Sequence, residues 1–118
     1  MKRVYICSPY AGDRAANTEN AIRYCRFAAE RGCDPFAPHL FYTRFLNDAV
    51  PSERLFGVEL GLRRIEECDE LWVFGNTISP GMQAEIERAE RIGRPVHYFN
   101  GELEERPFPK ERTHGQNG

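Results

Sequence analysis

The chain has 118 residues, 41% of them hydrophobic and 29% charged, and its 16 basic and 18 acidic side chains give a formal net charge of −2. This length predicts one domain, and this composition is that of a folded chain. The balanced charge argues against a general nucleic-acid-binding protein, and no apolar run approaches the roughly 18 residues that a membrane span needs.

The strand signals in the first third of the chain flank one helix. The apolar run from Arg3 to Ser8 is typical of a strand buried on both faces, and turn-forming residues follow it. Asn17 or Thr18 is expected to cap a helix that runs to about residue 31 and ends at Gly32. The apolar face of this helix consists of Ala21, Ile22, Cys25, Ala28 and Ala29.

The middle of the chain predicts a short strand, a loop and a second helix. Residues 34–38 form the strand, which its two prolines limit, and residues 39–50 form a loop rich in aromatic side chains. Pro51 opens the helix, which reaches about Cys68. Its expected core face is Leu55, Val58, Leu62 and Ile65.

The last part of the domain predicts a strand over 69–74, a helix over 79–93 and a strand over 95–99. Gly75 closes the first of these strands, and Gly93 ends the helix. The polar tail, 100–118, is expected to be a surface extension and not a second domain.

This alternation of strands and helices predicts an α/β domain over residues 1–99. We expect a Rossmann-like (flavodoxin-like) three-layer sandwich with a mostly parallel sheet of four or five strands in the order 2-1-3-4. In such a sheet a ligand binds beyond the carboxyl ends of strands 1 and 3. The loops 8–14 and 75–82 are predicted to meet there.

The start of the helix 79–93 is a candidate anion site. Ser79 is placed to cap it, with Pro80 at the first helical position. Free N–H groups and the positive end of the helix dipole would attract a phosphate, and Gly81 would let a ligand approach the backbone. The alternative is an ordinary helix start without a ligand.

Glu85 is the most informative residue of this helix. It falls inside the apolar arc of Met82, Ile86, Ala89, Ile92 and Gly93. Other acids of the helix have a basic partner four residues on, as Glu87 has Arg91, whereas Glu85 has Ala89 there. Either Glu85 has a function on the buried side, or it lies at the flank with its carboxylate in water.

Several other residues have a functional and a structural interpretation. Tyr5 either hydrogen-bonds to Glu85 or packs in the core, and Arg14 either pairs with an anion or lies on the surface. Tyr10, His39 and Phe41 either stack on a planar base or pack together. The G-x-x-x-G spacing of Gly57 and Gly61 indicates either a dimer contact or close packing on the sheet of the same chain.

The cysteines and the N-terminus indicate the compartment. The four cysteines contain no C-x-x-C pair, which favours thiols in a reducing cytoplasm over a zinc site or disulfides. No small-residue cleavage site follows Met1-Lys2-Arg3, so no signal peptide is expected. Dinucleotide and phosphate-loop glycine patterns are absent. We expect a cytoplasmic protein without a metal or a cofactor.

Three segments together resemble a known group of enzymes. These are Val4–Tyr10, Cys68–Gly75 and Ser79–Glu85. They resemble an uncharacterised family of phage and bacterial genomes and, more distantly, the nucleoside 2-deoxyribosyltransferase superfamily, including the 2'-deoxynucleoside 5'-monophosphate N-glycosidases. The resemblance implies a nucleotide or nucleoside ligand. From the glycine spacing we expect a homodimer or a higher homo-oligomer, with no membrane and no direct nucleic-acid partner.

The resemblance also implies roles for single residues. Glu85 matches the glutamate that attacks the anomeric carbon, and Tyr5 matches the tyrosine that contacts it. Ser79 matches a phosphate-binding serine, and Arg14 aligns loosely with an arginine of the first loop. The full candidate site has Ser79, Gly81, Met82, Arg14 and Ser8 at the phosphate, and Tyr10, Asp13, His39 and Phe41 at the base and sugar.

The chain departs from the superfamily at two positions. An acidic residue eight positions before Asp69 is usual in the hydrolases, and this chain has Gly61 there. Gln83 replaces the usual glycine two positions before the nucleophile.

From the resemblance, the first expected function is an N-glycosidic bond hydrolase or transferase that acts on a (deoxy)nucleoside 5'-monophosphate through a Glu nucleophile. The alternative is a non-catalytic module of the same fold that binds or senses a nucleotide derivative.

Overall fold

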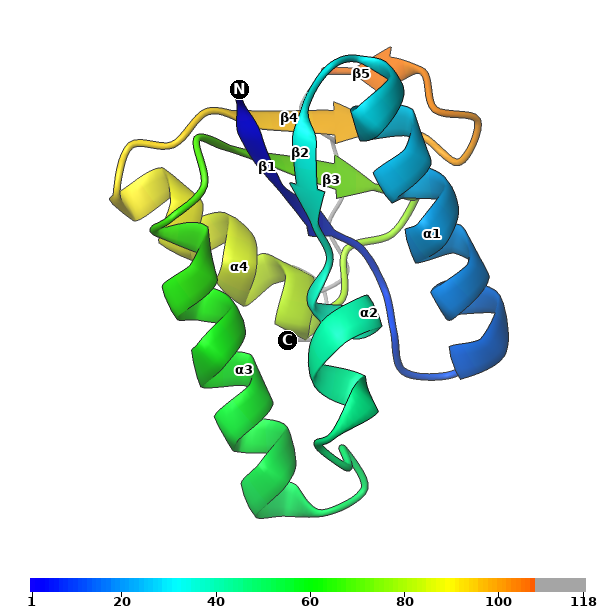
Figure 1. Cartoon of the computed structure of the whole chain (residues 1–118), viewed down its shortest axis with the longest axis vertical. Coiled ribbons are helices and arrows are strands. Elements are labelled where there is room, and N and C mark those ends of the chain that lie inside the picture. Colours follow the sequence, from blue (N-terminus) through cyan, green and yellow to red (C-terminus); the bar gives the residue numbers. More distant parts are fainter. Residues whose placement is uncertain (108–118) are drawn as a thin grey trace.

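The computed structural model describes residues 1–107, and its centre is a five-stranded sheet (Figure 1). The strands are β1 (Arg3–Cys7), β2 (Asp34–Phe36), β3 (Glu70–Phe74), β4 (Val96–Phe99) and β5 (Glu105–Arg106). They lie in the order β2-β1-β3-β4-β5, with the first four parallel and β5 antiparallel to β4. The predicted fold class and the strand order 2-1-3-4 are confirmed.

Helices cover both faces of the sheet and complete the three layers (Figure 1). α1 (Arg14–Glu30) packs on one face, and α3 (Pro51–Ile65) and α4 (Pro80–Arg91) pack on the other. The short helix α2 (Pro38–Phe41) and the 3₁₀ helix η1 (Tyr42–Arg44) follow β2 below the sheet in this view. No helix within residues 1–107 is long and apolar enough to cross a membrane.

Alternate residues of β1 and β3 supply the two cores. Val4, Ile6, Trp72 and Phe74 pack against Tyr24 and Phe27 of α1. Tyr5, Cys7, Leu71 and Val73 pack against Met82 and Ile86 of α4. Both faces of the central strands are therefore dry, as the unbroken apolar runs predict.

The start of α1 differs from the prediction, whereas its end agrees. Asp13 is the N-cap, and its carboxylate accepts a hydrogen bond from the backbone N–H of Ala16 at 3.1 Å. Asn17 lies inside the helix, and its side-chain amide donates to the carbonyl of Tyr10 at 2.9 Å. The predicted cap was wrong because an earlier acid was available. Gly32 ends the helix with φ +77°, a conformation that other residues avoid.

The predicted apolar face of α3 is wrong over the first half of the helix. Ile65 is buried, but the side chains of Leu55 and Val58 are 65% and 48% exposed. Figure 1 shows the reason, since the N-terminal half of α3 extends past the end of the sheet. Ile22 of α1 is likewise half-exposed, because that helix buries Tyr24 and Phe27 instead.

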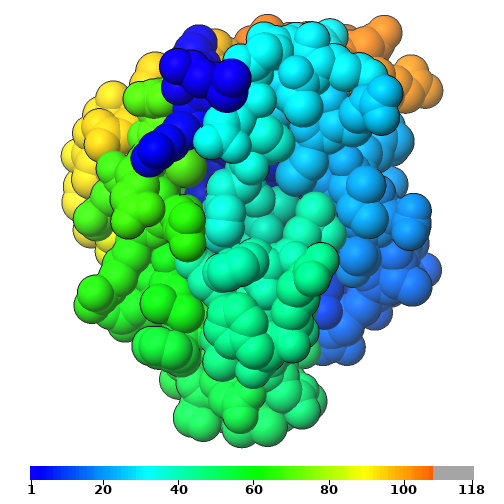
Figure 2. All heavy atoms as spheres, viewed as in Figure 1, coloured from blue at the N-terminus to red at the C-terminus, as the bar shows by residue number. Residues whose placement is uncertain are grey.

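The predicted loop 39–50 contains α2 and η1, and its aromatic residues pack on one another. The ring of Phe41 lies 6.0 Å from that of Phe36, 5.2 Å from Tyr42 and 5.5 Å from Phe45. Figure 2 shows this segment at the lower centre of the surface. In the predicted tail, residues 105–106 form β5, and residues 108–118 lie outside the described part of the chain.

Candidate active site

A cavity of about 370 Å³ lies at the carboxyl end of β1, between the segments that follow β2 and β3. Its wall includes residues of β1, α2, η1, α3 and the N-terminal end of α4. This is the switch point of the sheet, where the topology predicts a ligand, and the volume is that of a small-molecule site. Of the predicted site residues, Tyr5, Ser8, Tyr10, His39, Ser79, Gly81, Met82 and Glu85 line it.

Tyr5 and Glu85 form the deepest polar contact of the cavity. The Tyr5 hydroxyl donates a hydrogen bond to Glu85 Oε2 at 2.7 Å. Burial raises the pKa of Tyr5 well above its ordinary value, so the hydroxyl keeps its proton and remains a donor. The predicted interaction of the two residues is present.

Burial also governs the carboxyl group of Glu85. It raises the pKa to about 7, although hydrogen bonds from Tyr5 and Cys7 act in the opposite direction. Both donors are neutral, and within residues 1–107 no cation pairs with Glu85. A carboxyl group with such a pKa gains and loses its proton near neutral pH, which is typical of reactive carboxylates.

Gly61 of α3 makes room for this pair. A Cβ atom at Gly61 would lie 2.9 Å from the Tyr5 hydroxyl and 4.0 Å from Glu85 Oε2. A Cβ at Gly57 would lie 3.6 Å from Leu46 Cδ1. Both glycines therefore face their own chain. Gly61 packs on the sheet of the same chain, as one interpretation of the spacing predicts, and the dimer contact stays a prediction.

The N-terminal end of α4 opens onto the cavity with the predicted cap. Ser79 Oγ accepts a hydrogen bond from the Met82 N–H at 3.2 Å, and Pro80 follows at the first helical position. The Gly81 N–H has no partner among the described residues. This end of the helix thus has a free backbone donor at its positive end.

Ser8 and His39 add polar atoms to the wall. The Ser8 side chain is buried, and its hydroxyl has no hydrogen-bond partner within residues 1–107. His39 Nε2 lies 3.0 Å from the Ser8 carbonyl oxygen, which only accepts, so Nε2 carries the proton and Nδ1 is an acceptor. Burial lowers the pKa of His39, which favours the neutral ring. This ring stacks on Tyr10 at 4.8 Å.

Three predicted site residues do not line the cavity. Arg14 donates to Asp48 at 3.0 Å, Asp13 caps α1, and Phe41 packs in the aromatic cluster described above. The wall instead includes residues from the segment 42–58 that the sequence interpretation did not consider. Five residues of α3 line the cavity, and they have the spacing of one helix face, which could have grouped them: Glu53, Arg54, Gly57, Val58 and Gly61.

Two glutamates of α3 lie close in sequence to Gly61, the position at which the resembled hydrolases have an acidic residue, and their surroundings differ. Glu59 is exposed and pairs with Arg63 at 3.0 Å. Glu53 lines the cavity and accepts a hydrogen bond from the Asn47 N–H at 2.7 Å. Within residues 1–107 no three metal-ligating side chains form a cluster.

The fold and the cavity define a doubly wound α/β protein with a buried carboxylate at the switch point of its sheet. Residues 2–99 match the family described as "Domain of unknown function (DUF7768)", and the chain belongs to this family. No curated protein matches the chain.

Two solved structures share the fold. The first is a 2-deoxyribosyltransferase from the psychrotolerant bacterium Bacillus psychrosaccharolyticus, with a TM-score of 0.69 and 18% identity over 83% of this chain and 72% of that chain. The second is a 2-deoxyribosyltransferase from Leishmania mexicana, with a TM-score of 0.56 and 16% identity over 100% of this chain and 87% of that chain. The predicted resemblance to this superfamily is confirmed for the fold.

Proposed function

We propose that the protein cleaves or exchanges the N-glycosidic bond of a (deoxy)nucleoside 5'-monophosphate, with Glu85 as the nucleophile. The contact between Tyr5 and Glu85 in the cavity wall carries this proposal. A carboxyl group with a pKa of about 7 is ionised in part of the molecules at neutral pH, and an ionised carboxylate can attack carbon. The two solved structures named above are deoxyribosyltransferases, which supports this class of reaction.

The reaction has two steps. A Glu85 oxygen attacks the anomeric carbon, the bond to the base nitrogen breaks, and the base leaves with the bonding electrons and takes up a proton. Water or a second base then attacks the same carbon, gives up a proton and releases the Glu85 carboxylate. Tyr5 positions Glu85 by holding Oε2. The Ser79 hydroxyl and the Gly81 N–H at the start of α4, with the Ser8 hydroxyl, offer donors to the phosphate, and Met82 lines the same end of the cavity.

The second candidate function is a binding module without turnover. Gly61 supports it, because the hydrolases that this chain resembles have a carboxylate at that position and here a Cβ would already meet Tyr5. The stacked Tyr10 and His39 rings would then form the wall for a base, with the His39 Nδ1 atom as an acceptor.

One experiment separates the two functions. The purified protein is incubated with ribo- and deoxynucleoside 5'-monophosphates, and free base is measured by chromatography. We expect release that Glu85→Ala and Glu85→Gln each reduce by at least roughly 1,000-fold. Release that survives both substitutions would contradict the nucleophile. No release, together with a rise in melting temperature with one nucleotide, would establish the binding module.

We also propose that the chain forms a homodimer in the cytoplasm. Within residues 1–107, six of the eight exposed large hydrophobic side chains belong to the segment 41–58, and such a patch is typical of an interface. They are Phe41, Phe45, Val50, Leu55, Phe56 and Val58. The four free thiols support a reducing compartment. Sedimentation should give a dimer that Leu55→Glu converts to a monomer, and a monomeric wild type would contradict this proposal.

A further inference from the structure

The cavity wall contains one cationic side chain that no other group neutralises. Of the lysines and arginines within residues 1–107, only Arg54 lines the cavity. Its guanidinium forms no hydrogen bond or ion pair with any described residue. Arg14, which the sequence suggested as the phosphate ligand, already donates to Asp48 at 3.0 Å.

The neighbouring carboxylates have other partners. Asp48 pairs with Arg14, and Glu53 accepts a hydrogen bond from the Asn47 N–H at 2.7 Å. Arg54 lies in the first turns of α3, where the positive end of the helix dipole disfavours a cation. The Arg54 side chain is exposed where it lines the cavity, and a bound anion there would offset its unfavourable interaction with the helix dipole.

The position of Arg54 fits a ligand that also reaches Glu85. Arg54 and Gly61 line the cavity from the same face of α3, and a rise of about 1.5 Å per residue places them about 10 Å apart along the axis. Gly61 is the residue beside Glu85. The same rise places Ser79 about 9 Å from Glu85 along α4.

The two helix starts also lie toward the same side of the molecule. In Figure 1, α3 and α4 both run toward the upper left, so their N-terminal ends point the same way, beyond the sheet. An arginine side chain and a sugar phosphate together span the distance from Arg54 to Glu85. The guanidinium fork also matches the oxygen atoms of a phosphate in a bidentate contact.

We propose that Arg54, and not Arg14, binds the anionic group of the ligand, and that this group is a phosphate ester on the sugar. This inference rests on the proposed function for the place of the sugar at Glu85. Arg54 is then a specificity-determining residue, which distinguishes a nucleoside monophosphate from an uncharged nucleoside.

The test uses 2-deoxyribose 5-phosphate as the probe and 2-deoxyribose as its uncharged counterpart, with binding measured by calorimetry. Wild type should bind the phosphate, and Arg54→Gln should weaken that binding roughly 10- to 100-fold. Arg54→Lys, which keeps the charge without the fork, should fall between the two. The matched control is Arg14→Lys, which keeps the charge opposite Asp48 at a residue outside the cavity wall and should stay within about twofold of wild type.

The probe has no N-glycosidic bond, so the result does not depend on turnover. The assignment is overturned if wild type binds the phosphate no better than the free sugar, if R54Q binds it as tightly as wild type, or if R14K loses as much as R54K. Phosphate binding that depends on Arg54, with no base released from any nucleotide, would support Arg54 and refute the catalytic proposal.

Discussion

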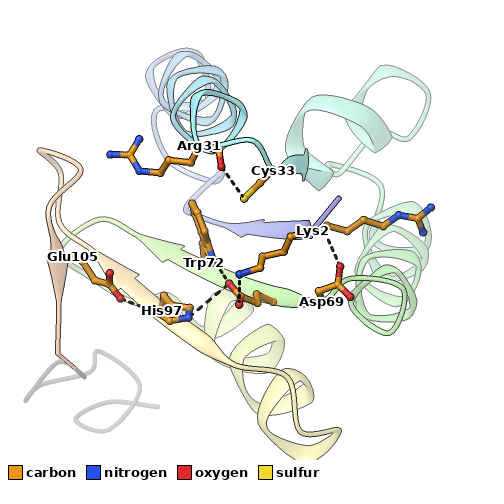
Figure 3. A network of polar contacts seen from close by, with 9 residues as sticks. Lys2, Arg31, Cys33, Asp69, Trp72, His97 and Glu105 are labelled. Atoms are coloured by element: carbon orange, nitrogen blue, oxygen red, sulfur yellow. Dashed lines mark hydrogen bonds and ion pairs between the residues drawn. The ribbon is translucent and has the colours of Figure 1, made fainter.

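The two ends of the parallel sheet carry polar clusters of opposite character. At the amino ends of the strands (Figure 3), Glu70 lies 2.9 Å from Lys2 Nζ and accepts a hydrogen bond from Trp72 Nε1 at 2.9 Å. His97 lies 3.7 Å from Glu70 and 2.8 Å from Glu105. At the carboxyl ends, Glu85 has only neutral donors. One cluster is paired and near the surface, and the other is not paired and lines a cavity.

This difference gives the two carboxylates opposite pKa shifts. Burial alone would raise the pKa of Glu70, but hydrogen bonds from Trp72 and Lys2 outweigh it and lower the pKa below 4.5. Burial dominates at Glu85 and raises the pKa to about 7. The contacts of Glu70 with Lys2 and Trp72 are those of a group with a structural role. A carboxylate buried without a cation lowers stability, so its presence at a switch point indicates a function.

The largest expected effect on stability comes from Glu85→Gln at high pH. The pKa of Glu85 is about 7 in the folded protein, against 4.5 for the free group, so the folded state holds a proton that the unfolded state releases. The free energy of unfolding of wild type should therefore fall as the pH rises from 4.5 to 8. The amide of the Glu85→Gln variant does not titrate, and the variant should be more stable than wild type by roughly 2–3 kcal/mol at pH 8.

Urea denaturation at a series of pH values measures this effect. The difference between E85Q and wild type should shrink toward zero below pH 4.5, where the carboxyl group of wild type is largely protonated in both the folded and the unfolded state. Curves that stay parallel from pH 4.5 to pH 8 would show that burial does not raise this pKa.

A smaller effect on the free energy of unfolding is expected for a substitution at Gly61. This residue of α3 lies beside Tyr5 and Glu85, the pair at the carboxyl end of the sheet. Gly61→Ala places a Cβ 2.9 Å from the hydroxyl of Tyr5, a buried residue whose hydroxyl is held by its hydrogen bond to Glu85. We expect a loss of about 1–2 kcal/mol in the free energy of unfolding, from overpacking.

Gly57→Ala is the matched control, since its Cβ meets Leu46 at an ordinary 3.6 Å. It should be neutral, or stabilise the helix by up to about 1 kcal/mol. Equal denaturation midpoints for the two variants would contradict the role of Gly61 in making room for Tyr5.

Gly61 also marks the limit of what the sequence predicts. The glycine spacing and the missing carboxylate were visible along the chain, but the fit of Gly61 to Tyr5 depends on two elements far apart in sequence. Glu85 was predictable, because one helix fixes its neighbours and the arc around it is apolar. The strand order followed from alternating strands and helices, which leave few topologies.

The errors in prediction fall where packing between elements decides. Leu55 and Val58 have the spacing of a core face, yet α3 extends past the sheet and leaves them exposed. Arg14 closes the predicted loop, but Asp48, distant in sequence, neutralises it. Arg54 shares a helix face with Gly57 and Gly61, but the spacing alone does not show that this face meets a cavity, since that depends on how α3 lies against α2 and α4.

The smallest effect is expected at the other end of the sheet, where Glu70→Gln makes the same chemical change as Glu85→Gln. The lowered pKa of Glu70 contributes stability above pH 4.5, and this contribution is lost as the pH falls through the folded-state pKa. The variant should therefore be less stable than wild type at neutral pH, by no more than about 1 kcal/mol because the pairs lie near the surface. Binding of deoxyribose 5-phosphate should not change.

Urea denaturation of both variants at pH 8 should change the free energy of unfolding in opposite directions. It should fall for Glu70→Gln and rise for Glu85→Gln, relative to wild type. Two losses of stability would mean that Glu85 is held as a structural group like Glu70, and the contrast between the two ends of the sheet would no longer support a function at the cavity.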